Sequence, residues 1–242
     1  MTNFWVFLIA ENITINISMV DTRAISLIME LRGQGILDSR VLSAVERTPR
    51  DLFVDAPFET SAYQNTALPI ACGQTISQPY IVAYCAQELE VQPNHRVLEV
   101  GTGSGYQAAV LARLCRMLYT IERHRPLLKQ AEARFKELKL HNVVTRHGDG
   151  YKGWPEQAPF DRILLTAAVP EVPADLINQL KPGGILIAPE GKPISAESIS
   201  QDLVKIIRTE DGVERQSLIP VVFVPMVPGL PKASSDDPER KS

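Results

Sequence analysis

Glycines at alternate positions mark the first place where this chain could bind a ligand. In the stretch VLEVGTGSGYQAAVLA, residues 97–112, Gly101, Gly103 and Gly105 separate an apolar run from a helix-like run. Glycines let the backbone turn sharply and let a ligand approach closely at the carboxyl end of a strand. The spacing differs from the dinucleotide fingerprint GxGxxG, in which Tyr106 would be glycine, and a GxxxxGK[ST] phosphate loop is absent. The loop therefore predicts the nucleotide-binding corner of an α/β sheet.

Three carboxylates accompany this loop. Glu99 lies in an apolar run, where an unpaired carboxylate would be costly. Glu122 follows Gly101 by 21 residues, where a carboxylate can accept hydrogen bonds from both hydroxyls of a ribose. Asp149 lies between Gly148 and Gly150 after a third apolar run. Glu122 could also be an exposed charge at a strand end, and Asp149 could be a turn residue.

The loop and its acidic neighbours resemble motif I of the class I S-adenosylmethionine-dependent methyltransferases. The segment LKPGGILI, residues 180–187, is similar to the one that leads into the fifth strand of many of these enzymes. The resemblance implies S-adenosyl-L-methionine as the cofactor, with Glu122 at the ribose and Asp149 at the adenine amino group.

A second polar stretch, GQTISQPY, could hold the other reactant. Thr75, Ser77 and Gln78 stand directly before a helix that begins at Pro79. The free amides and the dipole at a helix start favour an anion there. Ser77 or Gln78 could equally serve only as the cap of this helix, and the residues alone leave both interpretations open.

The marks of several methyl acceptors are missing. The chain lacks the [DN]PP[FY] motif for amino groups of bases, because residues 166–173 read TAAVPEVP, and no cysteine follows a proline. A cluster of carboxylates for a metal is also missing. A carboxylate acceptor needs none of these, because its pKa of roughly 4 leaves it ionised at neutral pH without a general base. Positioning its oxygen in line with the sulfonium methyl would then suffice.

Composition and charge exclude several classes of protein. The 242 residues are 45% apolar and 22% charged, and a net charge of −3 argues against nucleic-acid binding through bulk charge. The apolar run at residues 4–10 is too short to span a membrane and lacks the basic start of a signal peptide. Cys72, Cys85 and Cys115 form no CxxC pair or Cys/His cluster. We therefore expect no metal, no membrane association and a reducing compartment, the cytoplasm.

The predicted elements describe an α/β fold with a helical N-terminal cap, whose second helix starts at the capping residue Asp38. Helices alternate with short strands from Pro79 onward, which predicts a doubly wound, mostly parallel, Rossmann-like sheet. The last two strands lack a helix between them and are expected to be antiparallel. The expected helices are residues 22–32 (capped by Asp21), 39–48, 79–91, 106–115, 126–140 and 173–180, and the expected strands are 96–101, 117–123, 143–150, 160–168, 183–191, 202–210 and 212–226.

Longer stretches narrow the resemblance to one family. DSRVLSAVERTPRDLFV, ALPIACGQTISQPYIVA, the glycine-loop stretch and FVPMV closely resemble the protein-L-isoaspartate O-methyltransferases, over roughly residues 19–227. The resemblance implies methyl transfer to the free α-carboxylate of L-isoaspartyl residues in damaged proteins and peptides. The ester then closes to a succinimide, which reopens partly to normal aspartate. As the mechanism we expect a direct in-line displacement without a covalent enzyme intermediate.

The resemblance also implies a set of site residues. It places the active-site serine at Ser77 and further substrate contacts at Thr75 and Gln78. The loop 67–73 is expected to cradle the substrate peptide, although this chain has Ala71 where the family usually has glycine, which leaves the loop shape and any contact of Cys72 open. The implied cofactor contacts are Thr75, Ile76, Ser77, Glu99, Gly101, Thr102, Gly103, Ser104, Gly105, Glu122, Asp149 and Gly150.

One domain and two alternative functions complete the prediction. We expect an extension over residues 1–18, a single monomeric domain over 19–228 with its cap and substrate loop up to residue 78, and a disordered tail from residue 229. A methyltransferase of RNA or a small molecule would draw support from the basic stretch Arg113–Arg146, although such a stretch is more often a solvated face. A scaffold that binds the cofactor without catalysis would be expected to lack Ser77 or a loop glycine, and all are present.

Overall fold

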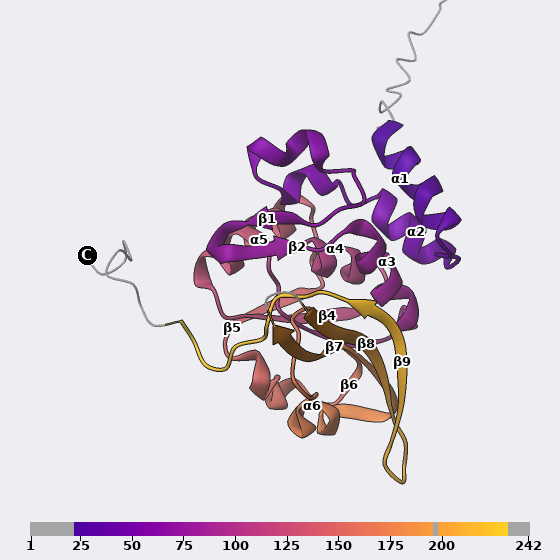
Figure 1. Cartoon of the computed structure of the whole chain (residues 1–242), viewed down its shortest axis with the longest axis vertical. Helices are drawn as coiled ribbons and strands as arrows, with labels where there is room; N and C mark the ends of the chain where they lie inside the picture. Colours follow the sequence, from indigo (N-terminus) through magenta and orange to yellow (C-terminus); the bar gives the residue numbers. More distant parts are fainter. Residues whose placement is uncertain (1–21, 196–197, 232–242) are drawn as a thin grey trace, which may run out of the picture.

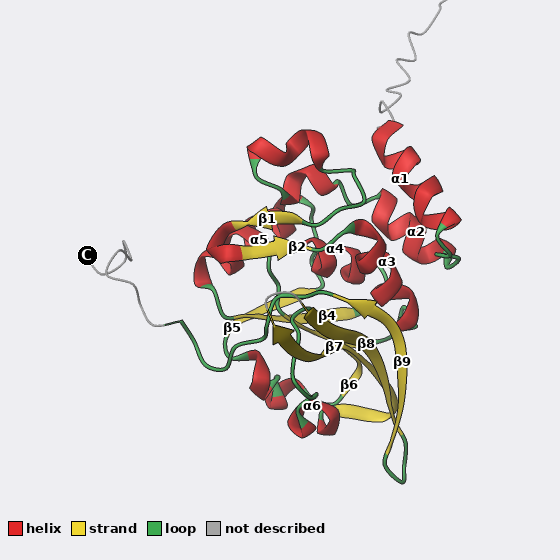
Figure 2. Ribbon diagram, viewed as in Figure 1, coloured by secondary structure: helices red, strands yellow, loops and turns green. Residues whose placement is uncertain are grey.

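The cap at the N-terminal end of the fold consists of two helices, as predicted (Figures 1 and 2). The computed structural model describes residues 22–195 and 198–231, so the expected extension, the Asp21 cap and the tail beyond residue 231 lie outside the described residues. Helix α1 spans Thr22–Gly33 and α2 spans Ser39–Glu46. The Asp38 side chain accepts the backbone N–H of Arg40, which confirms it as the cap of α2.

The segment between the cap and the core is more ordered than the sequence predicted. Two short 3-10 helices, η1 (Arg50–Phe53) and η2 (Ala56–Ser61), precede an antiparallel pair of strands, β1 (Leu68–Ile70) and β2 (Gln74–Ile76). The turn η3 (Ala71–Gly73) joins these strands, with Cys72 at φ 59° and Gly73 at φ 65°. Ala71 lies outside the left-handed region, so its replacement of the family's glycine does not strain the backbone.

The core is a seven-stranded sheet in the order β5-β4-β3-β6-β7-β8-β9. Strands β3 to β7 are parallel, whereas β8 and β9 are antiparallel, which confirms the predicted architecture. Among the described residues, no helix is both long and apolar enough to cross a membrane. The core elements are α3 (Pro79–Glu88), β3 (Arg96–Val100), α4 (Tyr106–Ala112), β4 (Met117–Glu122), α5 (Arg125–Glu137), β5 (Val143–His147), η4 (Gly150–Lys152), η5 (Pro155–Gln157), β6 (Phe160–Leu165), α6 (Ala174–Asn178), β7 (Leu180–Ser195), β8 (Ser198–Arg208) and β9 (Val213–Val221).

The two faces of the sheet pack into separate apolar clusters. Val97 of β3 belongs to the cluster under α3, α4 and α5, whereas its neighbour Leu98 belongs to the cluster that includes Leu176 of α6. Figure 1 shows α3, α4 and α5 on one side of the sheet and α6 on the other. Because side chains alternate along a strand, Glu99 lies on the same face as Val97, toward the three helices.

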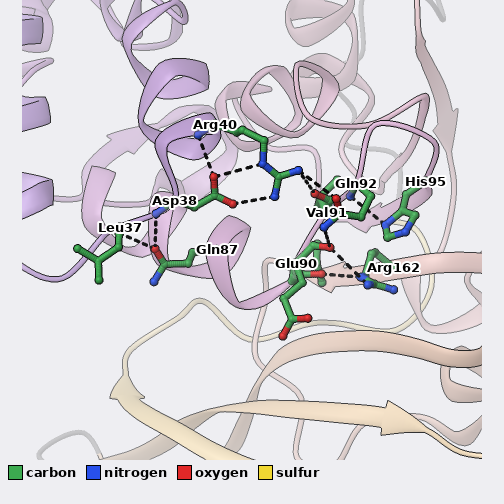
Figure 3. Close-up of polar contacts among 10 residues, drawn as sticks. Leu37, Asp38, Arg40, Gln87, Glu90, Val91, Gln92, His95 and Arg162 are labelled. Carbon is green, nitrogen blue, oxygen red and sulfur yellow. Dashed lines mark hydrogen bonds and ion pairs between the residues drawn. The ribbon is translucent and has the colours of Figure 1, made fainter.

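The cap is fastened to the core by polar contacts with the chain around the end of α3 (Figure 3). The Gln87 side-chain oxygen accepts the backbone N–H groups of Leu37 (2.8 Å) and Asp38 (3.1 Å). Arg40 holds Asp38 and donates to the carbonyl of Val91 at 3.1 Å. These contacts satisfy backbone groups that a helix end and a connecting loop would otherwise leave without partners.

Candidate active site

Two adjoining cavities lie at the carboxyl ends of the central strands. The chain passes from β3 to β4 on one side and returns to β6 on the other, so β3 and β6 flank the point where the strand order reverses. Ligands of such sheets bind in the crevice at this point. The larger cavity, of about 330 Å³, lies against the glycine loop and the C-terminal segment 224–227. The smaller, of about 50 Å³, contains Ser77, and the two cavities share a wall of Thr75, Gly101, Gly103 and Thr166.

The glycine loop follows β3 in a conformation that favours glycine. Gly101, Gly103 and Gly105 have φ values of 101°, 54° and 90°. A Cβ atom at Gly101 would lie 2.2 Å from the Thr166 hydroxyl oxygen, and one at Gly105 would lie 2.9 Å from the Phe135 ring. Gly105 itself lines neither cavity. Gly101 therefore brings the loop against the end of β6, and Gly105 brings it against α5.

Glu122 ends β4 at the edge of the larger cavity and is 5% exposed. One carboxylate oxygen accepts the backbone N–H of Gly103 at 2.9 Å, and the other accepts that of His124 at 2.8 Å. This carboxylate is not the exposed strand-end charge that the sequence allowed as an alternative. Each of its oxygens has a further lone pair for a ligand hydroxyl.

Replacing Glu122 tests its contact with the ligand. Because hydrogen bonds to a charged group are worth about 1.5–3 kcal/mol, Glu122→Gln is expected to weaken S-adenosylhomocysteine binding roughly tenfold or more. Titration calorimetry measures this affinity. Glu156→Gln removes an exposed carboxylate and should leave the affinity unchanged. An unchanged affinity in Glu122→Gln would restrict Glu122 to bracing the loop.

Glu99 is fully buried on β3 and lines neither cavity. One oxygen accepts the Thr120 hydroxyl at 2.6 Å, and the Thr120 oxygen lies 2.6 Å from that of Thr102 in the glycine loop. The other Glu99 oxygen has no partner among the described residues. Burial raises the pKa of Glu99 to about 8, against the opposing effect of the Thr120 hydrogen bond and with a smaller contribution from Glu122. Glu99 is therefore connected to the glycine loop through the hydroxyl groups of Thr120 and Thr102.

The raised pKa of Glu99 makes stability depend on pH. Between the ordinary pKa of 4.5 and about 8, the folded state holds a proton on Glu99 that the unfolded state has lost. The free energy of unfolding therefore falls as pH rises through this window. Glu99→Gln stays neutral and removes this contribution. Urea unfolding at several pH values should show a steeper decline for the native protein than for Glu99→Gln, and equal slopes would contradict the raised pKa.

Asp149 and Gly150 follow β5. Gly150 lines the larger cavity, where a Cβ atom would lie 2.4 Å from Val100. Asp149 lines neither cavity, and its two oxygens accept the backbone N–H groups of Tyr151 (3.0 Å) and Gly229 (2.8 Å). Asp149 thus fastens the C-terminal segment beside the cavity, and its contact with adenine stays a prediction.

The residues of GQTISQPY divide between the cavities and the helix start. Thr75 lines both cavities, and Ile76 and Ser77 line the smaller one together with Thr102 and Ser104 of the loop. Gln78 is the N-cap residue of α3, lines neither cavity and makes no capping hydrogen bond. The side chain of Asn65 instead accepts the backbone N–H of Tyr80 at the helix start, at 2.9 Å. Ser77 is therefore available to a ligand, whereas the position of Gln78 offers no support for its predicted substrate contact.

Sequence reasoning missed three parts of this site. Thr166, directly after β6, donates to the Gly101 carbonyl at 2.6 Å and lines both cavities. Residues 224–227 also line the larger cavity. This segment lies beside Ala168, whose backbone N–H donates to the Val224 carbonyl. His124 also lines it. The position of Thr166 at the carboxyl end of a central strand could have revealed it.

The residues present fit a nucleoside-containing cofactor. The larger cavity falls in the range of about 300–1,000 Å³ that is usual for small-molecule sites. Gly101 and Gly150 border it at positions where a Cβ atom would clash, and the Glu122 carboxylate faces it. The fold, the glycine loop and this cavity together define a class I methyltransferase.

Comparison with known proteins gives the family. The chain belongs to the protein-L-isoaspartate(D-aspartate) O-methyltransferase family, whose model matches residues 22–230. It is 58% identical over 212 residues to the protein-L-isoaspartate O-methyltransferase of Paramagnetospirillum magneticum, covering 88% of this chain and 98% of that protein. The enzyme of the same name from Parvibaculum lavamentivorans is 60% identical over 210 residues, covering 87% and 94%.

Solved structures agree with this assignment. A protein-L-isoaspartate O-methyltransferase structure superposes with a TM-score of 0.75 at 28% identity, covering 84% of this chain and 65% of that one. A structure from Plasmodium falciparum, assigned to the same enzyme and in complex with S-adenosyl-L-homocysteine, has a TM-score of 0.71 at 25% identity, covering 84% and 97%.

Proposed function

We propose that this protein is a repair methyltransferase that transfers a methyl group from S-adenosyl-L-methionine to the free α-carboxylate of L-isoaspartyl residues in damaged proteins and peptides. The observation that carries the proposal is the shared wall of the two cavities. The nucleoside-sized cavity adjoins the one that contains Ser77, so a member of this family can place the two reactants next to each other.

The smaller cavity suits an acceptor that is already ionised. None of its lining residues is His, Lys, Asp or Glu. Its one thiol, Cys85, is buried, and burial raises the pKa of this thiol to about 12, so it stays protonated at neutral pH. This lining offers no general base, and a carboxylate acceptor needs none.

A buried positive charge favours an anion in this region. Arg50 of η1 is fully buried, has no ion pair with a carboxylate among the described residues, and places its guanidinium 4.9 Å from the ring centroid of Tyr106. Tyr106 lines the smaller cavity. Burial lowers the pKa of Arg50 to about 10, so it keeps its charge at neutral pH. An ionised substrate is attracted by this charge more strongly than a neutral methyl ester product.

The roles of the residues follow from their positions. The Ser77 hydroxyl donates a hydrogen bond to one carboxylate oxygen of the substrate and so orients the other toward the shared wall. Thr75 borders both reactants, and Glu122 and the glycine loop hold the cofactor. When bound, S-adenosyl-L-methionine supplies an electrophilic methyl group on a positively charged sulfur. We place the protein in the cytoplasm, in keeping with its three free cysteines, and we expect it to act as a monomer.

Two peptides that differ only in one linkage test the substrate. Methyl transfer from labelled S-adenosyl-L-methionine is measured with an L-isoaspartyl peptide and its normal aspartyl counterpart. Selective, alkali-labile labelling of the isoaspartyl peptide is the expected result. Labelling of neither peptide, with the cofactor still bound, would leave the fold assignment intact and overturn the substrate. If RNA is labelled in the same assay and neither peptide is, the alternative function as an RNA methyltransferase would be favoured.

A further inference from the structure

A third cavity, of about 330 Å³, lies away from the active site between α2 and the end of α4. Helix α2 and its C-cap contribute Ser39, Arg40, Ser43 and Arg47, and Arg113 faces them from the C-cap of α4. The lining contains no acidic residue. None of these residues lines either of the cavities described above.

The three arginines of this cavity differ in their partners. Arg40 is neutralised by Asp38, which it holds through two nitrogens at 2.9 and 3.3 Å (Figure 3). Arg113 donates to the Thr48 hydroxyl at 2.9 Å, and Arg47 donates to the Ser43 carbonyl. Within residues 22–195 and 198–231, neither Arg47 nor Arg113 forms an ion pair with a carboxylate. Two guanidinium groups therefore face one cavity with their charges uncompensated.

The repulsion between the two guanidinium groups affects the pKa of Arg113. Burial and the nearby charge of Arg47 lower the pKa of Arg113, and no carboxylate opposes these two effects. Burial also lowers the pKa of Arg162, but there Glu90 and Asp161 oppose the effect. An anion between Arg47 and Arg113 would relieve their repulsion.

We propose that this cavity is a binding site for a phosphate dianion, free or as the monoester of a small molecule. Guanidinium groups bind phosphate through paired, charge-assisted hydrogen bonds, and two of them match its double charge. Ser39 and Ser43, four residues apart on one face of α2, add hydroxyl donors for the remaining oxygens. The cavity also has room for more than the phosphate group, which allows a small ester substituent.

Calorimetric titration of the full chain at constant ionic strength tests this site, with inorganic phosphate and glycerol 3-phosphate as probes. We expect saturable binding of one probe molecule per chain, and the tighter of the two probes identifies the source of the phosphate. Arg47→Gln and Arg113→Gln should each weaken binding roughly tenfold or more, and Arg113→Lys should weaken it less because it keeps the charge. Arg116→Gln removes a neighbouring exposed arginine outside the cavity lining and should leave binding unchanged.

A fold defect is distinguished from a lost contact by thermal unfolding without phosphate. Arg47 is exposed, so Arg47→Gln should have the same unfolding temperature as the native protein. The site can therefore still be tested with this variant if Arg113→Gln is unstable. Binding that is absent in the native protein, or that survives in Arg47→Gln, would overturn the proposal. Equal responses to chloride and phosphate would overturn it too.

Discussion

Ser77→Ala is expected to lower kcat/KM for an L-isoaspartyl peptide roughly 100-fold while leaving S-adenosylhomocysteine affinity within about twofold, because an active-site donor acts mainly on the reacting group. Ser77 lines only the smaller cavity, so its hydroxyl reaches the acceptor side of the shared wall. The loss should be carried by kcat and by the peptide KM. Steady-state methyl transfer and calorimetry measure the two quantities separately.

The matched control for this variant is Ser26→Ala. Ser26 is an exposed serine of α1 whose hydroxyl donates only to the carbonyl of Thr22, four residues earlier. Its removal should change neither turnover nor cofactor affinity. Equal losses of turnover and cofactor affinity in Ser77→Ala would reassign Ser77 to cofactor binding. Full activity of Ser77→Ala would mean that the Ser77 hydroxyl does not contact the substrate.

Gly101→Ala should cause the largest loss of cofactor affinity among single methyl additions to the loop. The new Cβ would lie 2.2 Å from the Thr166 hydroxyl oxygen, and φ is 101°, a conformation that costs a non-glycine residue about 1–3 kcal/mol. Either the Thr166 side chain or the loop must move, and Gly101 and Thr166 both line the two cavities. We expect at least roughly a 100-fold loss of S-adenosylhomocysteine affinity together with a lower unfolding temperature.

Gly103→Ala separates the clash from the backbone strain. Gly103 also has a positive φ, of 54°, but a Cβ there meets nothing closer than a terminal carbon of Ile70 at 3.8 Å. The smaller loss expected for Gly103→Ala measures the strain alone. Adding Thr166→Ala to Gly101→Ala removes the clashing oxygen and should restore part of the affinity. If Gly103→Ala is as damaging as Gly101→Ala, the contact with Thr166 is not the cause.

Much of the fold follows from local patterns in the sequence. The alternation of strands and helices after Pro79 predicted the parallel sheet, and the missing helix between the last two strands predicted their antiparallel pairing. The pairing of β1 with β2 escaped prediction, because strands of three residues are too short to show a period. Their pairing depends on Leu68 and Ile76, which are partners across the two strands and are both buried against the core.

The candidate site divides in the same way. The chain's own residue types and spacing predicted the glycine loop and the carboxylate at the end of β4, because each is encoded within a few neighbouring residues. For the serine ahead of α3 they left two interpretations open, and only the resemblance to the family favoured Ser77. Only the tertiary structure decided that Thr166 completes the wall between the cavities, that residues 224–227 close the larger one and that Asp149 holds Gly229. These contacts join segments from distant parts of the chain. They form because the parallel pairing of the strands brings their carboxyl ends to one edge of the sheet, and no local pattern in the sequence shows which distant segment will lie there.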